Sequence, residues 1–252
     1  MNDATARALN AINRAFYRER AADFSATREG PWPGWRLLWQ ELALRGVPDP
    51  LRVLDVGCGN GRWGRFLAER APGLRYTGLD ASPELLELAA RTGSLGRDPE
   101  FLRVDLVEDD LAGALGDRRF DWIACFGVLH HLPGRERRRA LLAELLARLA
   151  PGGRLCLTCW RLSQFERARR RILPWEEWNQ SREPRIDPGR LEPGDHLLPW
   201  DLGQGHRYVH FAHEGETAEL LAELPCRVLE CFTADGRSGD ANRYFVVAPS
   251  VP

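Results

Sequence analysis

Glycines and an acid are grouped in the segment LDVGCGNGRWG, which follows a short apolar run and precedes a helical pattern. Its members with candidate roles are Asp55, Gly57, Gly59 and Gly61. Glycines between a strand and a helix let backbone N–H groups approach a ligand at the helix N-terminus. Such a crevice lies at the carboxyl edge of an open parallel sheet, so the segment predicts a site for a nucleotide cofactor.

Two further acids follow the next apolar runs. Asp80 ends the second run at the spacing expected for a ribose contact, and Asp105 follows the third run. A helix N-cap is the alternative role for Asp80, although Ser82 can serve as that cap. An ordinary strand-end turn is the alternative for Asp105. By spacing alone the glycines also fit the G-x-G-x-x-G pattern of dinucleotide dehydrogenases, so the loop by itself leaves two cofactor classes open.

Alternating apolar runs and helical patterns supply the frame for these residues. Strands are expected over 51–57, 74–80, 100–106, 120–129 and 151–160, with two more over 226–234 and 243–249. Strands that alternate with helices are typical of a parallel sheet. We therefore expect an α/β fold, Rossmann-like and doubly wound, with a mostly parallel seven-stranded sheet and helices on both faces.

The chain is expected to form one domain with an elaborated edge. The expected parts are an N-terminal helical cap (1–50), a cofactor-binding core (51–160), a substrate-side insert after the fifth strand (161–212) and a C-terminal helix and strands (213–252). A long excursion inside a domain is usually a lid or a binding segment. Its tryptophans, Trp175, Trp178 and Trp200, are interpreted as packing residues.

The composition is that of a globular protein. The 252 residues are 44% hydrophobic and 28% charged, the net charge is −1, and every positive residue is an arginine. No segment reaches the length of a membrane span or resembles a secretory signal, so we expect a cytoplasmic protein without a membrane partner. Cys156 and Cys159 form a C-x-x-C on a predicted strand, where they point to opposite faces, so no metal site is expected.

Three features extend the glycine loop into a longer pattern. Asp55 and Gly57 make it D-x-G-x-G-x-G, Asp105 stands after the third strand, and a Pro-Gly-Gly turn at 151–153 leads into the fifth. Together they resemble the class I S-adenosylmethionine-dependent methyltransferases over residues 51–160.

This resemblance implies a place for each part of the cofactor S-adenosylmethionine. The glycine loop is implied to lie by the methionine part, Asp80 to hold both ribose hydroxyls, and Asp105 to hold the adenine amine. Ala81, Leu106 and Phe126 are implied to line the same site.

Segments outside the cofactor core carry a closer resemblance. FSATREGPWPGW, VLHHLPGRERRR with the later CWRLSQ, and LLPWDLGQGHRYVHFAHEGE are similar to segments of the tRNA wobble-uridine carboxymethyl methyltransferases. The similarity spans nearly the whole chain, although GDANRYFVV matches the family's C-terminal pattern only loosely. It implies methylation of the carboxylate of 5-carboxymethyluridine, with tRNA and a small activator protein as partners.

That chemistry sets what the site needs. A carboxylate has a pKa near 4 and is ionised at neutral pH, so methyl transfer needs no general base, only in-line positioning and exclusion of water. A cation and aromatic faces for an unstacked base are then expected. Arg28 is the first candidate cation, for the carboxylate of either the substrate or the cofactor. Trp32 and Trp160 are candidates to flank the base.

Residues after the fourth strand and in the insert complete the candidate set. His130 and His131 are expected to border the transfer site, with a helix cap as the alternative role for one of them. Arg207 and Tyr208 are expected to face that site if the insert folds back over it.

Three functional hypotheses stay open. The first is methylation of a carboxylate or oxygen of a modified tRNA wobble uridine, and the second is methylation of a small acidic metabolite. The third is a non-catalytic subunit with a methyltransferase fold. The arginine runs at 135–139 and 167–171 are interpreted as solvated helix faces, with steering of a tRNA backbone as the alternative.

Overall fold

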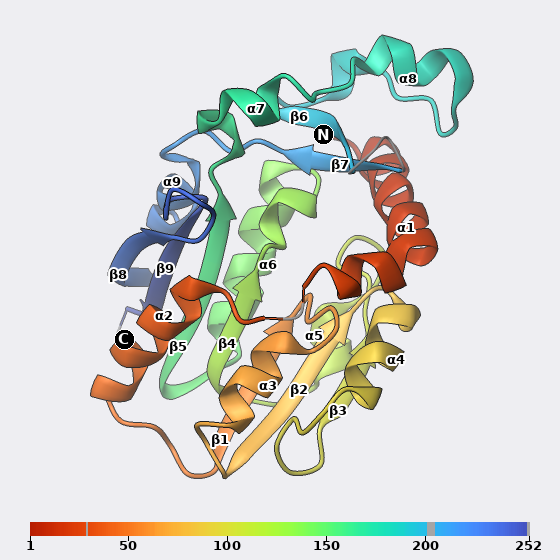
Figure 1. Cartoon of the computed structure of the whole chain (residues 1–252). Coiled ribbons are helices and arrows are strands. Elements are labelled where there is room, and N and C mark those ends of the chain that lie inside the picture. Colours follow the sequence, from red (N-terminus) through yellow and green to blue (C-terminus); the bar gives the residue numbers. More distant parts are fainter. Residues whose placement is uncertain (29, 201–204, 251–252) are drawn as a thin grey trace.

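The computed structural model describes residues 1–28, 30–200 and 205–250 (Figure 1). Residues 29 and 201–204, which belong to two of the family-like segments, lie outside the described residues.

One large sheet forms the centre of the molecule. Its strand order is β3-β2-β1-β4-β5-β9-β8. The strands are β1 Leu51–Val56, β2 Leu74–Asp80, β3 Glu100–Arg103, β4 Phe120–Phe126, β5 Leu149–Trp160, β8 Cys226–Ala234 and β9 Asn242–Pro249. Strands β1 to β5 run parallel, whereas β9 is antiparallel to both of its neighbours. The predicted seven-stranded, mostly parallel sheet is confirmed.

Helices cover both faces of this sheet (Figure 1). One face packs against α2 Pro33–Leu44, α3 Arg62–Ala68 and α4 Pro83–Arg91, and the other against α5 Leu111–Leu115, α6 Arg135–Ala147 and α9 Glu216–Ala222. Each face has its own apolar core. Helix α4 begins as predicted, with the Ser82 hydroxyl accepting from the Leu85 N–H and a proline in the first turn.

The remaining elements lie over the carboxyl edge of the parallel strands, at the top of Figure 1. They are α1 Asp3–Ala26, η1 Leu129–His131, η2 Leu162–Gln164, α7 Glu166–Arg169, α8 Trp175–Ser181, η3 Pro188–Arg190, and the antiparallel pair β6 Asp195–Pro199 and β7 His206–His210. Helix α1 shares an apolar cluster with α8 and this pair. Trp175 and Trp178 are buried in that cluster, which confirms their interpretation as packing residues.

Two boundaries differ from the sequence expectation. Strand β3 stops at Arg103, because the Asp105 side chain accepts from the Val107 N–H and turns the chain. The segment 151–153, expected as a turn before the fifth strand, lies inside β5 and produces a shift of register against β4. Cys156 and Cys159 pack on opposite faces of β5, as predicted.

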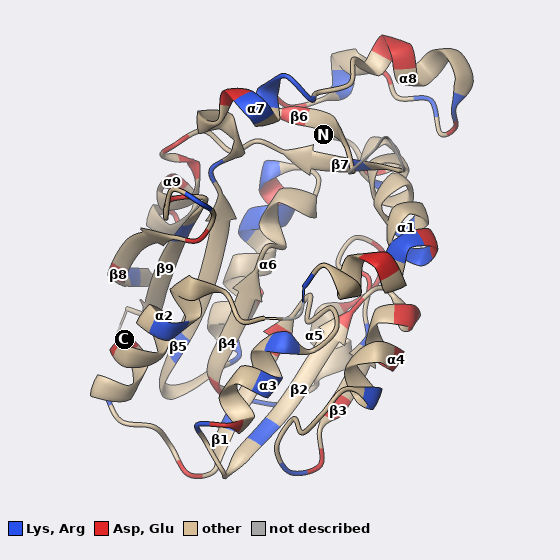
Figure 2. Cartoon of the chain, in the orientation of Figure 1, with Lys and Arg blue, Asp and Glu red and all other residues tan. Residues whose placement is uncertain are grey.

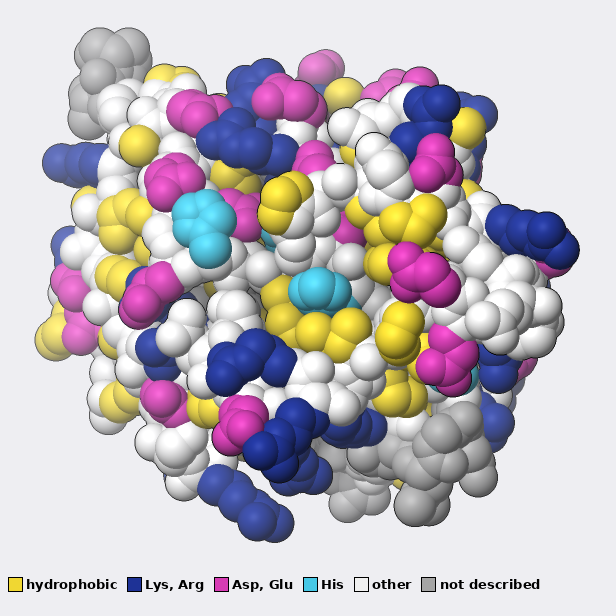
Figure 3. Space-filling view, turned by 90° about the horizontal axis from the view of Figure 1, so that it is seen from above, with side chains coloured by type: hydrophobic (Ala, Val, Ile, Leu, Met, Phe, Trp, Pro, Cys, Tyr) yellow, Lys and Arg dark blue, Asp and Glu magenta, His cyan; other side chains and the backbone are white. Residues whose placement is uncertain are grey.

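Charged side chains of both signs are interspersed over the described surface (Figure 2). The face seen from above shows arginines beside acids, with apolar and histidine side chains between them (Figure 3). Within the described ranges no helix is both long and apolar enough to cross a membrane. Surface charge therefore does not single out one face, and the site has to be found from its geometry.

Candidate active site

The glycine loop connects β1 to α3 at the carboxyl edge of the sheet. Gly57, Gly59 and Gly61 all have positive φ angles, of 65°, 54° and 76°. At Gly57 a Cβ would stand 2.5 Å from a methyl carbon of Val128, so only glycine fits there. At Gly59 no described atom lies within 4 Å of that position, and the backbone borders open space. The loop is therefore a close approach point for a ligand.

Asp80, at the end of β2, points back to this loop. Its Oδ2 accepts from the Gly59 N–H and its Oδ1 from the Ser82 N–H, both at 2.9 Å. Burial raises the pKa of this carboxyl, while the backbone N–H donors oppose that shift. Ser82 caps α4 at the same time, so the acid is not needed as the helix cap.

Asp55 lies beneath the loop and has one described side-chain donor, the Tyr76 hydroxyl at 2.6 Å. Burial raises its pKa to about 7, with the nearby Asp80 charge acting in the same direction. The folded state therefore binds a proton at Asp55 more tightly than the unfolded chain, whose carboxyl has a pKa of 3.8. This stabilisation is complete below about pH 4 and is lost as the pH rises to about 7.

Replacement of Asp55 by asparagine is expected to flatten that pH dependence, because the amide oxygen still accepts from Tyr76 but carries no charge. Between pH 5 and pH 8 the free energy of unfolding of the wild type should fall by about 2 kcal/mol more than that of Asp55→Asn. Urea unfolding of the protein without ligand at the two pH values measures this difference. Equal losses in the two proteins would contradict the assignment.

A cavity of about 470 Å³ opens above Asp80 and the loop. Thirteen of the residues predicted for the site line it: Arg28, Trp32, Asp55, Gly57, Gly59, Asp80, Ala81, Asp105, Leu106, Phe126, His131, Trp160 and Arg207. These residues come from α1–α2, from the ends of β1 to β5 and from the insert. The long insert does fold back over the carboxyl edge of the sheet.

Three predicted residues do not line the cavity. Gly61 caps α3 and faces Ala89 instead. Tyr208 is fully buried, and its hydroxyl donates to Asp195 at 2.7 Å, so the expectation that its side chain faces the substrate is wrong. The alternation of side chains along β7 explains why its neighbour Arg207 faces the cavity while Tyr208 faces away. His130 lies behind the cavity wall, with its ring stacked on Trp160 at a centroid distance of 3.8 Å.

His131 links α1 to the insert. Its Nε2 lies 3.0 Å from the Tyr17 hydroxyl and its Nδ1 3.1 Å from the carbonyl oxygen of Tyr208. Burial, together with the charge of Arg207, lowers the pKa of this imidazole to about 3, so the ring is neutral. A neutral ring satisfies both contacts when Nδ1 donates to the carbonyl and Nε2 accepts from Tyr17. This geometry suits a residue that positions neighbours, not a base.

Arg207 brings a cation into the cavity from β7. The residue is 5% exposed, and its Nε and Nη1 have no hydrogen-bond partner among the described residues. The guanidinium lies over the rings of Phe16 and Trp160, 5.1 and 5.7 Å from their centroids. Both Nε and Nη1 are covered by protein atoms, so it is as a buried charge at the cavity wall that Arg207 is a candidate partner for an anionic group of a ligand.

Arg28 and Trp32 form the N-terminal wall. The Arg28 guanidinium lies 3.7 Å from the centroid of Phe24, and the Trp32 ring stacks on Trp35 at 5.3 Å. The Asn60 amide in the glycine loop donates to the Ser25 hydroxyl at 2.9 Å. The N-terminal segment is thereby attached directly to the loop.

Helix α1 supplies cavity residues that the sequence interpretation missed. Asn10, Asn13 and Tyr17 all line the cavity. Their spacing of three and four residues places them on one face of the helix, which is the signal that could have identified them.

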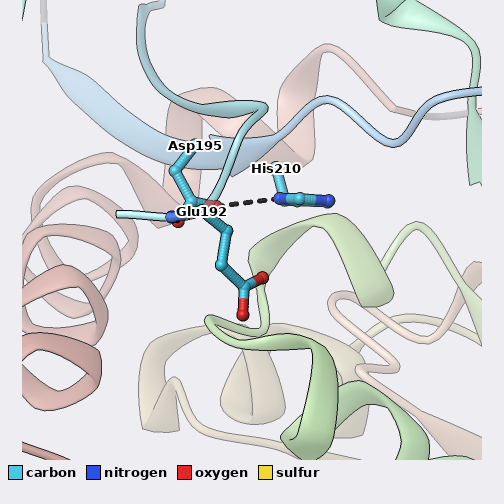
Figure 4. Close-up of side chains that lie close together, drawn as sticks. All are labelled: Glu192, Asp195 and His210. Atoms are coloured by element: carbon cyan, nitrogen blue, oxygen red, sulfur yellow. Dashed lines mark hydrogen bonds and ion pairs between the residues drawn. The ribbon is translucent and has the colours of Figure 1, made fainter. Parts of the chain in front are cut away.

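A second group of titratable side chains, Glu192, Asp195 and His210, lies close together at the β6–β7 pair and does not line the cavity (Figure 4). By distance alone Glu192, Asp195 and His210 could hold a metal ion. The ring nitrogens of His210 instead face two carboxylates, Asp195 at 2.8 Å and Glu216 at 2.9 Å. Arg138 contacts Glu192 at 3.0 Å and Glu216 at 2.9 Å. The group is therefore better described as an ion-pair network.

Protonation states in this network follow from the contacts. Burial opposes a charge on His210, but its hydrogen bonds to the two carboxylates outweigh burial and raise its pKa. The pKa of Glu216 falls to about 2, because His210 and Arg138 overcome the opposing effect of burial. Arg138 belongs to the run 135–139 and is 3% exposed, so the interpretation of that run as a solvated face is wrong at this position.

Taken together, the fold and the cavity fit one class of enzyme. Residues 54–155 match the family described as "Methyltransferase domain". The cavity suits S-adenosylmethionine. Asp80, at the end of the second strand, accepts from two backbone N–H groups, and the glycine loop and Asp105 lie at the wall of the same cavity. The chain is an S-adenosylmethionine-dependent methyltransferase of the class I fold.

Solved methyltransferases share the architecture over the full chain. The structure titled "DhpI-SAM-HEP complex" superposes with a TM-score of 0.64 at 22% identity, covering 97% of this chain and 100% of the other. Magnesium protoporphyrin IX methyltransferase from Synechocystis PCC 6803 with bound SAM gives a TM-score of 0.58 at 16% identity, covering 99% and 98%. At these identities the likeness concerns the fold.

Several of the curated proteins that resemble this chain share one enzyme name, whereas the solved structures share only the fold. The chain is 27% identical over 223 residues to the tRNA (carboxymethyluridine(34)-5-O)-methyltransferase of Schizosaccharomyces pombe, covering 85% of this chain and 88% of that protein. It is 35% identical over 148 residues to the Saccharomyces cerevisiae protein of the same name, covering 59% of this chain and 47% of that protein. The mouse counterpart is 32% identical over 59% of this chain, which spans 20% of that protein's length.

Proposed function

We propose that this methyltransferase transfers a methyl group to a carboxylate carried by a modified wobble uridine of tRNA. One observation carries the proposal, the buried guanidinium of Arg207 beside Trp160 in the same cavity as the glycine loop. The names of the curated relatives support the choice of the tRNA carboxylate. The buried free thiols, such as Cys125, suit a cytoplasmic location for this activity.

In this proposal the chain's residues bind and orient the two reactants. Asp80 accepts the ribose hydroxyls and Asp105 the adenine amine of S-adenosylmethionine, which supplies an electrophilic methyl group on sulfur. Arg207 would hold the acceptor carboxylate by its charge and orient one carboxylate oxygen in line with the methyl group that the cofactor would supply. In the proposal Trp160 and Trp32 supply faces for the uracil ring, and Arg28 is a further candidate cation for the carboxylate of the cofactor or of the acceptor.

The proposed chemistry needs no general base. An ionised carboxylate loses no proton on methylation, so nothing has to accept one. His131, the histidine that lines the cavity, is held neutral by burial with both nitrogens engaged by described partners. Residues of α1 and of the insert form part of the cavity wall and limit the access of water to the methyl group.

Transfer of a tritiated methyl group tests the proposed acceptor. We expect label in tRNA carrying 5-carboxymethyluridine, as an alkali-labile ester, and none in the same tRNA lacking that carboxylate. The near-neutral charge of the chain favours a second acceptor class, small acidic metabolites. Label in a metabolite extract with none in total tRNA would support this class and overturn the tRNA assignment.

Asp80→Ala is expected to weaken cofactor binding by about 10- to 100-fold, because two charge-assisted hydrogen bonds to the ribose are removed. Isothermal titration with S-adenosylhomocysteine measures the change. Glu84→Ala is the control, since Glu84 also lines the cavity rim but contacts Ser82 and not Asp80. An unchanged dissociation constant in Asp80→Ala would exclude the ribose contact.

A further inference from the structure

Asn10 on α1 holds the carboxylate of Asp105. Its amide nitrogen lies 2.9 Å from each of the two carboxylate oxygens, and both residues are buried at the cavity wall. The two positions are 95 residues apart in the chain. The single amide nitrogen thus makes a bifurcated hydrogen bond to both oxygens and restrains the carboxylate, so α1 contributes to the direction in which Asp105 presents its oxygens.

The remaining contacts of Asp105 show which lone pair is left for a ligand. Oδ1 accepts from Asn10 and also from the Val107 N–H at 3.0 Å. Oδ2 accepts from Asn10, while the Arg14 guanidinium lies 3.7 Å away, beyond hydrogen-bond distance. Each carboxylate oxygen has about two acceptor positions. One position on Oδ2 is therefore open to a donor in the cavity.

We propose that Asn10 is a positioning residue that makes the cofactor site selective for the 6-amino group of adenine. By fixing the carboxylate, it directs the open Oδ2 position at the exocyclic N–H. This inference rests on the proposed placement of adenine at Asp105. The N-terminal helix α1 thereby takes part in recognising the cofactor, although it lies outside residues 54–155, which match the methyltransferase domain.

Contacts at the other end of α1 support this role. Tyr17, two turns further along the helix, contacts His131, and Phe16 packs under Arg207. The helix is thus attached at the proposed adenine end and at the proposed transfer end of one cavity. A shift of α1 would move the Asn10 amide relative to Asp105.

Isothermal titration with two probes tests the proposal, S-adenosylhomocysteine and its 6-deamino analogue, which carries purine in place of adenine. We expect the wild type to prefer the adenine compound by about 30-fold, the value of a hydrogen bond to a charged group. In Asn10→Ala this preference should fall to below about 5-fold, while affinity for the 6-deamino analogue changes less than about 2-fold. Asn10→Leu, close in size, should give the same result if the alanine variant folds poorly.

Asn2→Ala is the matched control, because Asn2 caps α1 without touching Asp105. It loosens the helix generally and should leave the preference intact. In an Asp105→Ala background the Asn10 substitution should have no further effect on the preference.

The outcomes separate this inference from the proposed function. Equal weakening of both probes in Asn10→Ala would overturn the role of Asn10 while the methyltransferase site stands. A wild type that binds both probes equally would refute the placement of the 6-amino group at Asp105, and the inference with it. A wild type that binds neither probe would refute the proposed cofactor placement itself, and the inference with it.

Discussion

Replacing Arg207 by alanine is expected to lower kcat/KM for the tRNA acceptor by about 10²- to 10³-fold. The guanidinium is buried at the cavity wall, so an acceptor carboxylate bound beside it would gain a charge-assisted contact with a cation that has little access to water. Without this contact the carboxylate must enter a cavity that offers less compensation for its lost hydration. Single-turnover methyl transfer with 5-carboxymethyluridine-containing tRNA measures the loss.

Two comparisons make that result specific. Arg207→Lys keeps the charge but loses the fork of donors, so it should recover only part of the activity. Arg185→Ala removes an exposed arginine of the same insert and should stay within about 2-fold of the wild type. The affinity of Arg207→Ala for S-adenosylhomocysteine should be unchanged, because Arg207 is placed at the acceptor end. Full activity of Arg207→Ala would exclude the clamp.

The central sheet and the cofactor loop could be predicted because their signals are local. A buried parallel strand appears as a short apolar run, and the loop after β1 needs glycine where φ is positive or where Val128 leaves no room for a Cβ. Asp80 ends β2 and Asp105 comes two residues after the end of β3, so the topology alone brings them to the same edge. Such features require no knowledge of distant contacts.

The contributions of α1 and of the ion-pair network at the β6–β7 pair could not be predicted in the same way. Asn10 acquires its role only through Asp105, 95 residues away. In the sequence Arg138 looks like the half-buried arginines of the run 135–139, and only Glu192 and Glu216, 54 and 78 residues further on, distinguish it. The spacing of charges along a helix predicts which of them share a face. Whether one of them is buried depends on residues that are distant in the sequence and pack against it.

Arg138 also fixes the frame on which Arg207 depends. Its guanidinium joins α6 to Glu192 at the start of the β6–β7 pair and to Glu216 on α9. His210 at the end of β7 lies between Asp195 and Glu216 in the same network. The strand that carries Arg207 is therefore attached to the core through buried charges. This attachment connects the stability of the fold to the geometry of the cavity.

Arg138→Ala is accordingly expected to lower the free energy of unfolding by about 3 kcal/mol, because Glu192 loses the guanidinium that it contacts and the buried Glu216 keeps only His210. Urea unfolding followed by circular dichroism measures this change. Arg139→Ala is the matched control, since the next residue on α6 makes an exposed ion pair with Glu136 and should cost less than about 0.5 kcal/mol. A loss in Arg138→Ala as small as in the control would show that water replaces the guanidinium and that the network does not hold β7 to the core.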